Sequence, residues 1–219
     1  MKGFIEKIRG RSIPSLYRSF YAKVWDIYYD FKYNVDTDAH VLLENLDLSN
    51  EHKKHFYWYE GTKVRPLKKL FKHLDIPKDR RFIDIGSGKG RVLLVAAEYG
   101  FKKIIGIELS RSLYQISKKN IDTFKQKRNI DSQIEVLNIN ALDYVFKDDE
   151  DIIFLYNPFD EQTLKQLVFN IKSSKNRNNR EIKIIYANSI HHKAIEENLN
   201  VFNIERMSIY NVGFTIYDV

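Results

Sequence analysis

The chain has 219 residues, a length that fits one domain with an extension. Hydrophobic residues make up 43% of the chain and charged residues 30%, which is typical of a globular protein. Cysteine is absent, which excludes disulfides, thiolate nucleophiles and cysteine-ligated zinc, and no apolar run approaches the roughly 20 residues of a membrane-spanning helix. The net charge of +7 points toward a polyanionic partner, but basic residues are spread along the whole chain, so nucleic acid is not favoured. The basic N-terminus lacks the apolar core of a secretory signal, and a cytoplasmic location is expected.

Residues 1–62 are expected to form a helical extension that acts as a lid. Amphipathic, aromatic-rich patterns predict helices over Ile13–Tyr33 and Ala39–Leu48. Met1–Tyr33 carries seven basic and three acidic residues, so more than half of the net charge lies here. We interpret the extension as packing on the rest of the chain. Peripheral contact with a membrane surface or an acidic partner is the alternative.

Residues 63–219 alternate between helical and strand patterns. The predicted helices are Val64–Leu74, Arg91–Tyr99, Arg111–Arg128, Glu161–Ile171 and Ile190–Leu199. The predicted strands are Arg81–Ile85, Lys103–Glu108, Gln133–Leu137, Asp151–Tyr156 and Glu181–Ala187, followed by a hairpin of Phe202–Tyr210 and Phe214–Val219. The pattern predicts an α/β fold, a doubly wound and mostly parallel sheet with helices on both faces and a C-terminal antiparallel hairpin. Ligands of such sheets bind at the carboxyl ends of the strands.

A glycine-rich turn follows the first of these strands. Gly86, Gly88 and Gly90 alternate with other residues between the strand and the next helix, and glycine there lets a ligand approach the backbone. Glu108 ends the second strand, where its carboxylate is placed to accept hydrogen bonds from the two hydroxyls of a ribose.

The charge ahead of the turn distinguishes two classes of cofactor. Dinucleotide sites use G-x-G-x-x-G, whereas this turn reads G-x-G-x-G and has Arg91 at the place of the third dinucleotide glycine. Asp84 precedes the first glycine by two residues. Its carboxylate would repel a pyrophosphate and attract an amino-acid ammonium. The turn therefore favours a cofactor that carries an ammonium group.

The segment D-I-G-S-G-K-G resembles the first motif, D/E-x-G-x-G-x-G, of class I S-adenosylmethionine-dependent methyltransferases. The resemblance implies S-adenosylmethionine as cofactor and a seven-stranded sheet of order 3-2-1-4-5-7-6. It also implies that Asp84 reaches the methionine amino group and that Glu108 holds the ribose. The other cofactor-binding residues that it implies are Gly86, Ser87, Gly88 and Gly90 beside the methionine and ribose, Leu109 beside the adenine, and Asn140 with Ala141 near the adenine amino group. Asp143 is the alternative to Asn140.

Asn157-Pro158-Phe159 ends the fourth strand, where this fold brings the methyl acceptor to the cofactor. The triplet resembles the N-P-P-Y/F motif of N-methyltransferases, although the second proline is missing. The resemblance implies that Asn157 and Pro158 accept the hydrogens of the target nitrogen and that Phe159 packs on the acceptor. Asn157 would also adjoin the cofactor. The alternative is a strand that ends in an ordinary Asx-Pro turn.

The loop Tyr57–Thr62 is similar to the segment that closes over the cofactor in class I protein-lysine methyltransferases of the non-SET type. This similarity implies cofactor contacts for Tyr59 and Thr62. Alternatively, Trp58 and Tyr59 attach the extension to the core. His191 and His192 follow the fifth strand and could supply a general base, although adjacent histidines at a helix start are commonly capping or surface residues. No metal site is expected.

The expected function is transfer of the methyl group of S-adenosylmethionine to a nitrogen of a protein or small molecule. Methylation of nucleic acid is a second hypothesis. A third is a non-catalytic module that keeps the fold and docks to a membrane or a partner through its basic extension.

Overall fold

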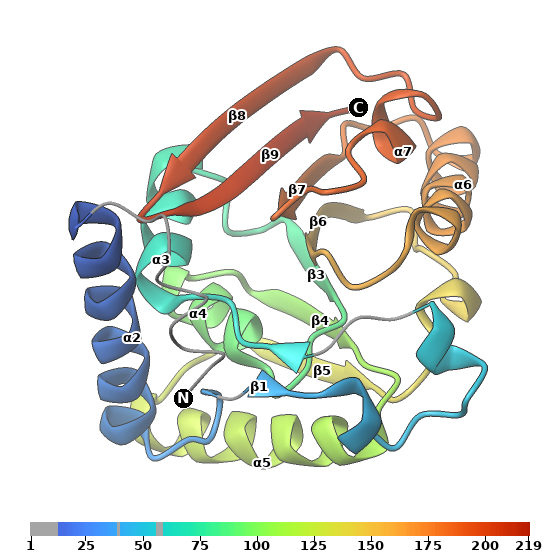
Figure 1. Cartoon of the computed structure of the whole chain (residues 1–219). Helices are drawn as coiled ribbons and strands as arrows, with labels where there is room; N and C mark the ends of the chain where they lie inside the picture. The colour runs from blue at the N-terminus through green and yellow to red at the C-terminus, as the bar shows by residue number, and fades with distance from the viewer. Residues whose placement is uncertain (1–12, 39, 56–58) are drawn as a thin grey trace.

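The computed structural model describes residues 13–38, 40–55 and 59–219. A seven-stranded sheet forms its centre, in the order β5-β4-β3-β6-β7-β9-β8 (Figure 1). The strands are β3 (Arg81–Ile85), β4 (Lys103–Ile107), β5 (Gln133–Leu137), β6 (Glu150–Tyr156), β7 (Lys183–Ala187), β8 (Asn203–Ile209) and β9 (Val212–Asp218). Strands β3 to β7 are parallel, and β9 runs antiparallel to both β7 and β8. Counted along the large sheet, this is the order 3-2-1-4-5-7-6, which confirms the prediction.

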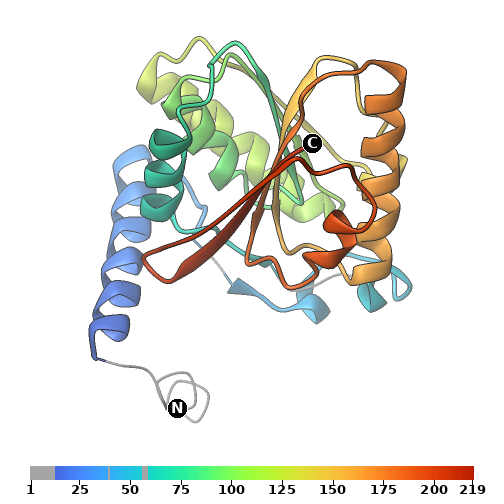
Figure 2. The same ribbon diagram turned by 90° about the horizontal axis from the view of Figure 1, so that it is seen from above.

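Helices cover both faces of the sheet, as Figure 2 shows from above. One face carries α2 (Ile13–Tyr33), α3 (Val64–Leu74), α4 (Arg91–Tyr99) and α5 (Arg111–Arg128), and the other carries α6 (Glu161–Arg177) and the short α7 (Lys193–Glu196). Each face has its own apolar core. Phe82 belongs to one core and its neighbour Ile83 to the other, because successive side chains of a strand point to opposite faces. Within the described ranges, no helix is both long and apolar enough to cross a membrane.

The extension before α3 differs from the prediction over Ala39–Leu48. Ala39 lies outside the described residues, and a helix is absent from the rest: the segment contains β1 (His40–Val41) and a 3-10 turn, Leu43–Asn45. A second 3-10 turn, His52–Lys54, follows, and β1 pairs antiparallel with β2 (Tyr59–Glu60). Asp47 explains the difference, because its carboxylate accepts hydrogen bonds from Ser110 and Ser112 at the start of α5. This distant contact overrides the local helical pattern.

Two helices near the C-terminus have other lengths than predicted. Helix α6 continues to Arg177 through a stretch that was predicted to be a loop. The helix continues because Ile171 and Ser174 are buried on the same face as its earlier apolar residues, and because the Ser174 hydroxyl donates a hydrogen bond to the Phe146 carbonyl. Helix α7 has only one turn, with Ala194 and Ile195 as its buried residues.

Candidate functional site

The glycine turn between β3 and α4 adopts a backbone that only glycine fits. Gly88 and Gly90 have φ angles of +54° and +85°. A Cβ on Gly88 would lie 2.0 Å from the ring of Tyr59, and one on Gly90 would lie 2.4 Å from the hydroxyl of Ser117. Both glycines are therefore required by conformation and by close packing, and Tyr59 holds the extension against the turn.

A pocket opens at the carboxyl ends of β3, β4 and β6, where ligands of open α/β sheets bind. Eight of the twelve residues predicted to bind cofactor line it: Tyr59, Thr62, Asp84, Gly86, Ser87, Glu108, Leu109 and Ala141. Gly88, Gly90, Asn140 and Asn157 are not among the lining residues. The sequence analysis missed Leu46, Leu48, Glu60, Gly61, Arg91, Val92, Ile107, Leu113, Ile139 and Tyr156, which also line the pocket.

Glu108 joins the second strand to the glycine turn. Its buried carboxylate accepts a hydrogen bond of 2.7 Å from the backbone N–H of Gly88 and one of 2.8 Å from that of Ser110. Burial raises the pKa of Glu108 to about 7. Each carboxylate oxygen keeps a second lone pair, so Glu108 can still accept hydrogen bonds from the hydroxyls of a ligand.

Asp84 presents a buried carboxylate to which the described part of the chain supplies no counterion. Among the described residues, nothing donates a hydrogen bond to its Oδ2 atom. Burial, and then the nearby charge of Glu108, raise the pKa of Asp84 well above its ordinary value. A buried carboxylate that lacks a partner is costly, and a ligand cation beside Asp84 would remove this cost. The pair therefore fits a ligand with one cationic group and a vicinal diol.

The chain after β5 supports the pocket mainly through its backbone. The Asn140 side chain accepts a hydrogen bond from the N–H of Leu142 and so caps the turn Ala141–Asp143, while Ala141 lines the pocket. Asn138, which the sequence analysis missed, donates to the carbonyls of Glu108 and Leu109 and fixes the end of β4. Asp143 is exposed.

A buried arginine connects the glycine turn to the extension. Arg91, the first residue of α4, lies 3.3 Å from a carboxylate oxygen of the fully buried Asp26. It lies 3.7 Å from Asp30 and 3.5 Å from Asp38, and its Nε donates to the hydroxyl of Thr37 at 2.7 Å. We name Arg91, Asp26, Asp30, Asp38 and Thr37 the Arg91 cluster. The cluster fixes α2 and the segment after it to the helix that begins at the pocket.

The same contacts continue into the loop before α3. Arg91 donates to the carbonyl of Thr62 at 3.4 Å, and the hydroxyl of Tyr59 donates to the carbonyl of Thr37 at 3.1 Å. Earlier in this loop, His55 lies 2.7 Å from a carboxylate oxygen of Asp160, which caps α6. Tyr57 and Trp58, to which the sequence analysis also drew attention, lie outside the described residues.

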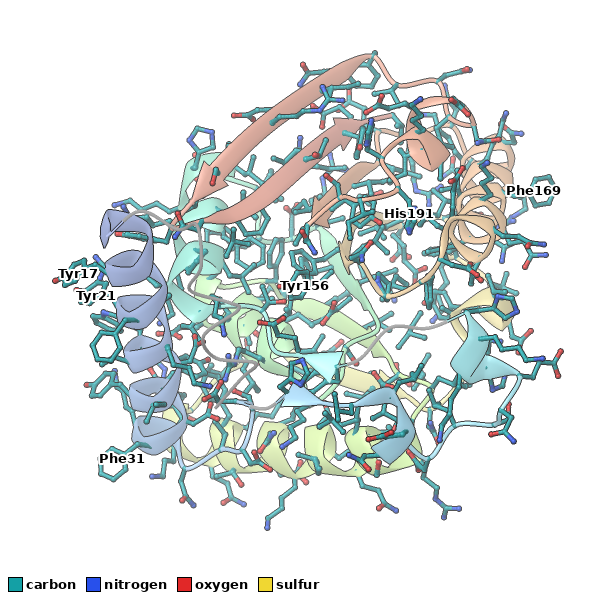
Figure 3. The ribbon with its side chains drawn as sticks, in the orientation of Figure 1. Tyr17, Tyr21, Phe31, Tyr156, Phe169 and His191 are labelled. Atoms are coloured by element: carbon teal, nitrogen blue, oxygen red, sulfur yellow. The ribbon has the colours of Figure 1, made fainter. Side chains whose placement is uncertain are left out.

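The end of β6 forms the side of the pocket opposite Glu108. Asn157 has a left-handed backbone, with φ of +40°, and its side-chain oxygen accepts a hydrogen bond of 2.8 Å from the hydroxyl of Tyr186 on β7. Pro158 and Phe159 line the pocket together with the half-buried Tyr156, which lies near the centre of the view in Figure 3. The structure thus brings two residues of the Asn-Pro-Phe triplet to the pocket, while the Asn157 oxygen contacts Tyr186.

Burial and two nearby acidic groups set the protonation state of the Tyr156 phenol. Burial, followed by the charges of Glu60 and Asp26, raises the pKa of Tyr156 far above neutral, so its phenol stays protonated. Glu60 lines the pocket and was missed because a single glutamate in an aromatic loop carries no recognisable motif. His191 and His192 are not among the lining residues; His192 is the N-cap of α7.

Comparisons with known proteins agree with this geometry. A family model described as histone methylation protein DOT1 matches residues 38–211. An RNA methyltransferase from Salinibacter ruber, in complex with S-adenosyl-L-homocysteine, has 13% identity and a TM-score of 0.55 over 72% of this chain and 92% of its own. A ribosomal protein L11 methylase from Lactobacillus delbrueckii subsp. bulgaricus has 20% identity and a TM-score of 0.51, with 68% and 76% coverage. An Aquifex aeolicus S-adenosylmethionine-dependent methyltransferase has 12% identity and a TM-score of 0.54, with 69% and 88% coverage. At these identities, the solved structures establish the fold alone.

Proposed function

The chain belongs to the family described as histone methylation protein DOT1, and from this premise we propose that it methylates a primary amine of a protein. It is an S-adenosylmethionine-dependent methyltransferase with the class I fold. The observation that carries the finer proposal is the acidic and aromatic wall of the pocket formed by Glu60, Tyr156 and Phe159.

The buried carboxylates support the choice of residues for the cofactor. Asp84 would bind the methionine ammonium, because it is a buried carboxylate without a counterion. Glu108 would accept from the ribose hydroxyls. Gly86, Ser87, Gly88 and Gly90 would lie along the methionine and ribose, Leu109, Asn140 and Ala141 around the adenine, and Tyr59, Thr62 and Asn157 at the closing side. When bound, S-adenosylmethionine would supply an electrophilic methyl group on sulfur for transfer to the lone pair of a neutral amine.

Charge at the opposite wall supports an amine as the acceptor. The Glu60 carboxylate would attract a lysine ammonium and repel the phosphates of a nucleic acid. Pro158 and Phe159 are apolar, and a desolvated amine loses its proton more readily than one in water. Asn157 and Pro158 would aim the nitrogen through their oxygens, which requires the Asn157 oxygen to turn from Tyr186 to the acceptor. These residues act by positioning and by excluding water.

The segment before α3 would act as a lid over this site. Leu46, Leu48 and Tyr59–Thr62 line the pocket, although they precede the sheet in sequence. This placement supports the division of the chain into an extension, residues 1–62, and a methyltransferase core, residues 63–219.

Binding of the nucleoside part of the cofactor should depend on the ionisation of Glu108. Only the carboxylate accepts from both ribose hydroxyls, and the pKa of Glu108 is raised to about 7. We therefore expect affinity for methylthioadenosine, which has no ammonium to contact Asp84, to rise about tenfold between about pH 6 and about pH 8. Isothermal titration across this range measures the effect. Glu108→Gln should bind more weakly and without the pH step, and a step that persists in this variant would contradict the assignment.

Glu60 provides the test of the acceptor. Transfer of a labelled methyl group to core histones and ribosomal proteins should occur, and should be lost when their amines are acetylated beforehand. Glu60→Gln should lower kcat/KM for the protein acceptor by about tenfold, equivalent to about 1.4 kcal/mol, with unchanged affinity for S-adenosylhomocysteine.

Glu44→Gln is the matched control, because Glu44 is exposed in a 3-10 turn and does not line the pocket. It should leave kcat/KM unchanged. Label that appears in RNA, or in acetylated and untreated proteins alike, would contradict an amine acceptor. No label in any of the untreated proteins would also count against it.

A further inference from the structure

Helix α2 exposes an apolar band on the side that faces away from the sheet. Its members, Tyr17, Phe20, Val24, Ile27 and Phe31, follow one another at intervals of three or four residues, and we name them the α2 stripe. Phe20 is 68% exposed and Phe31 83%. Figure 3 shows Tyr17 and Phe31 pointing away from the body of the molecule. A surface helix normally turns charged residues to this side, so the α2 stripe marks a contact surface.

The opposite face of the helix already has its partners. Ala22, Tyr29 and Tyr33 are buried, and the rings of Tyr29 and Tyr33 pack on Phe124 of α5. The α2 stripe is therefore a second apolar face on a helix whose first face holds it in the fold. Among the described residues, nothing buries the side chains of this second face.

The acidic residues of α2 point away from the stripe. Asp26 is fully buried beside Arg91 and Lys63, and Asp30 accepts hydrogen bonds from the backbone of Thr37 and Asp38. Glu6 is the only other acidic residue in Met1–Tyr33, against seven basic ones. The sequence of this segment therefore carries a net positive charge.

Aromatic rings and cations lie between α2 and α3. The half-buried guanidinium of Arg65 stacks on the rings of Tyr21, Trp25 and Tyr210, and the exposed Lys69 lies over the ring of Tyr210. The surface beside α2 thus combines a lysine with tyrosine and tryptophan. Tyrosine and tryptophan rings of this kind prefer the boundary between lipid headgroups and acyl chains.

We propose that α2 lies on the surface of an anionic lipid bilayer, with the α2 stripe at the headgroup boundary and the exposed Lys32 and Lys69 at the lipid phosphates. A helix that lies in a bilayer surface needs an apolar face flanked by basic residues, and the basic segment before α2 adds electrostatic attraction. The surface is independent of the methyl-transfer pocket, which opens at the carboxyl ends of the strands.

The residue types favour lipid over two other occupants. The three- and four-residue spacing also suits a seam between two helices, but such seams are built mainly from leucine, isoleucine and valine, and three of the five stripe residues are aromatic. Single-stranded nucleic acid needs successive flat rings on which bases stack. The centre of the α2 stripe is Val24 and Ile27, which offer no ring.

Vesicle flotation of the full-length protein tests the proposal. The protein should float with vesicles of phosphatidylcholine mixed with phosphatidylglycerol and remain behind with phosphatidylcholine alone. Phe20→Ser combined with Phe31→Ser should lower the bound fraction at least about tenfold. The matched control combines Phe169→Ser and Phe202→Ser, at residues 67% and 66% exposed, of which Phe169 lies on the outer side of α6 (Figure 3). This control should float like the wild type.

Two further measurements separate the alternatives. Both double variants should keep wild-type affinity for S-adenosylhomocysteine, which would show that they fold. Because this affinity is measured separately from flotation, failure of this proposal can be distinguished from failure of the proposed function. The proposal is overturned if the wild type does not float with anionic vesicles, or if both double variants lose flotation equally. It is also overturned if light scattering finds a dimer that only the Phe20/Phe31 variant disrupts, or if that variant loses affinity for an oligonucleotide instead of for lipid.

Discussion

Asp84→Asn is expected to weaken binding of S-adenosylhomocysteine about 10- to 100-fold, the effect of losing a hydrogen bond to a charged group. The same substitution should raise the thermal stability of the cofactor-free protein. Asp84 is buried without a counterion, and its pKa is raised well above the ordinary 3.8. An acid whose pKa is higher in the folded protein than in the unfolded chain destabilises the fold as the pH rises above the unfolded value. Asparagine cannot ionise and removes that loss at neutral pH.

Two ligands separate the role of Asp84 from general damage to the pocket. Isothermal titration should show weaker binding of S-adenosylhomocysteine to Asp84→Asn but nearly unchanged binding of methylthioadenosine, which lacks the amino-acid part. Glu108→Gln is the matched variant, because its residue faces the same pocket and should weaken both ligands. Equal weakening of both ligands by Asp84→Asn would exclude an ammonium contact. A lower melting temperature of the cofactor-free variant would contradict the stability argument.

Arg91→Leu is expected to cost about 3–5 kcal/mol of the free energy of unfolding, the usual loss when one partner of a buried ion pair is removed. Arg91 is buried in the Arg91 cluster, and its loss would leave the fully buried Asp26 with Lys63 as its remaining cation. Burial already raises the pKa of Asp26 although Arg91 and Lys63 lie beside it. Without Arg91 the carboxylate would be less well compensated still.

Urea unfolding measures this loss, and a second substitution tests its cause. Arg91→Leu combined with Asp26→Leu should recover much of the stability, because apolar residues can replace a buried pair at little cost. Lys165→Leu breaks the exposed ion pair with Glu161 and should leave the stability nearly unchanged. A double variant as unstable as the sum of the two single variants would show that the charges do not interact.

Local patterns were sufficient for the strands of the large sheet and for the carboxylates Asp84 and Glu108 of the site. Alternating strand and helix periods gave the strands, while the order of the strands followed from the resemblance of the segment Asp84–Gly90 to the first methyltransferase motif. That segment could be recognised because the residues of a strand and of the turn after it are neighbours in sequence. The predicted helix over Ala39–Leu48 was wrong because Asp47 contacts Ser110 and Ser112, more than sixty residues away. Local periodicity contains no information about such a contact.

The same reason explains what was missed in the site. Arg91 was interpreted only through its place in the glycine motif and not as an ion-pair partner, since Asp26, Asp30 and Asp38 lie in another helix and the segment after it. The hydrogen bond from Tyr186 to Asn157 could not be predicted, because it depends on the pairing of β6 with β7. Glu60 could be recognised as a pocket residue only from the tertiary structure, in which its charge acts on Tyr156. All three relations depend on tertiary contacts.

The Arg91 cluster ties α2 to the helix that begins at the pocket. If α2 rests on lipid, the tilt of the whole molecule is set by that helix, and the mouth of the pocket is held at a constant height above the headgroups. Acceptor amines would then be selected by their distance from the bilayer as well as by their chemistry. A substrate tethered too close or too far would remain unmodified, however well its lysine suits the pocket.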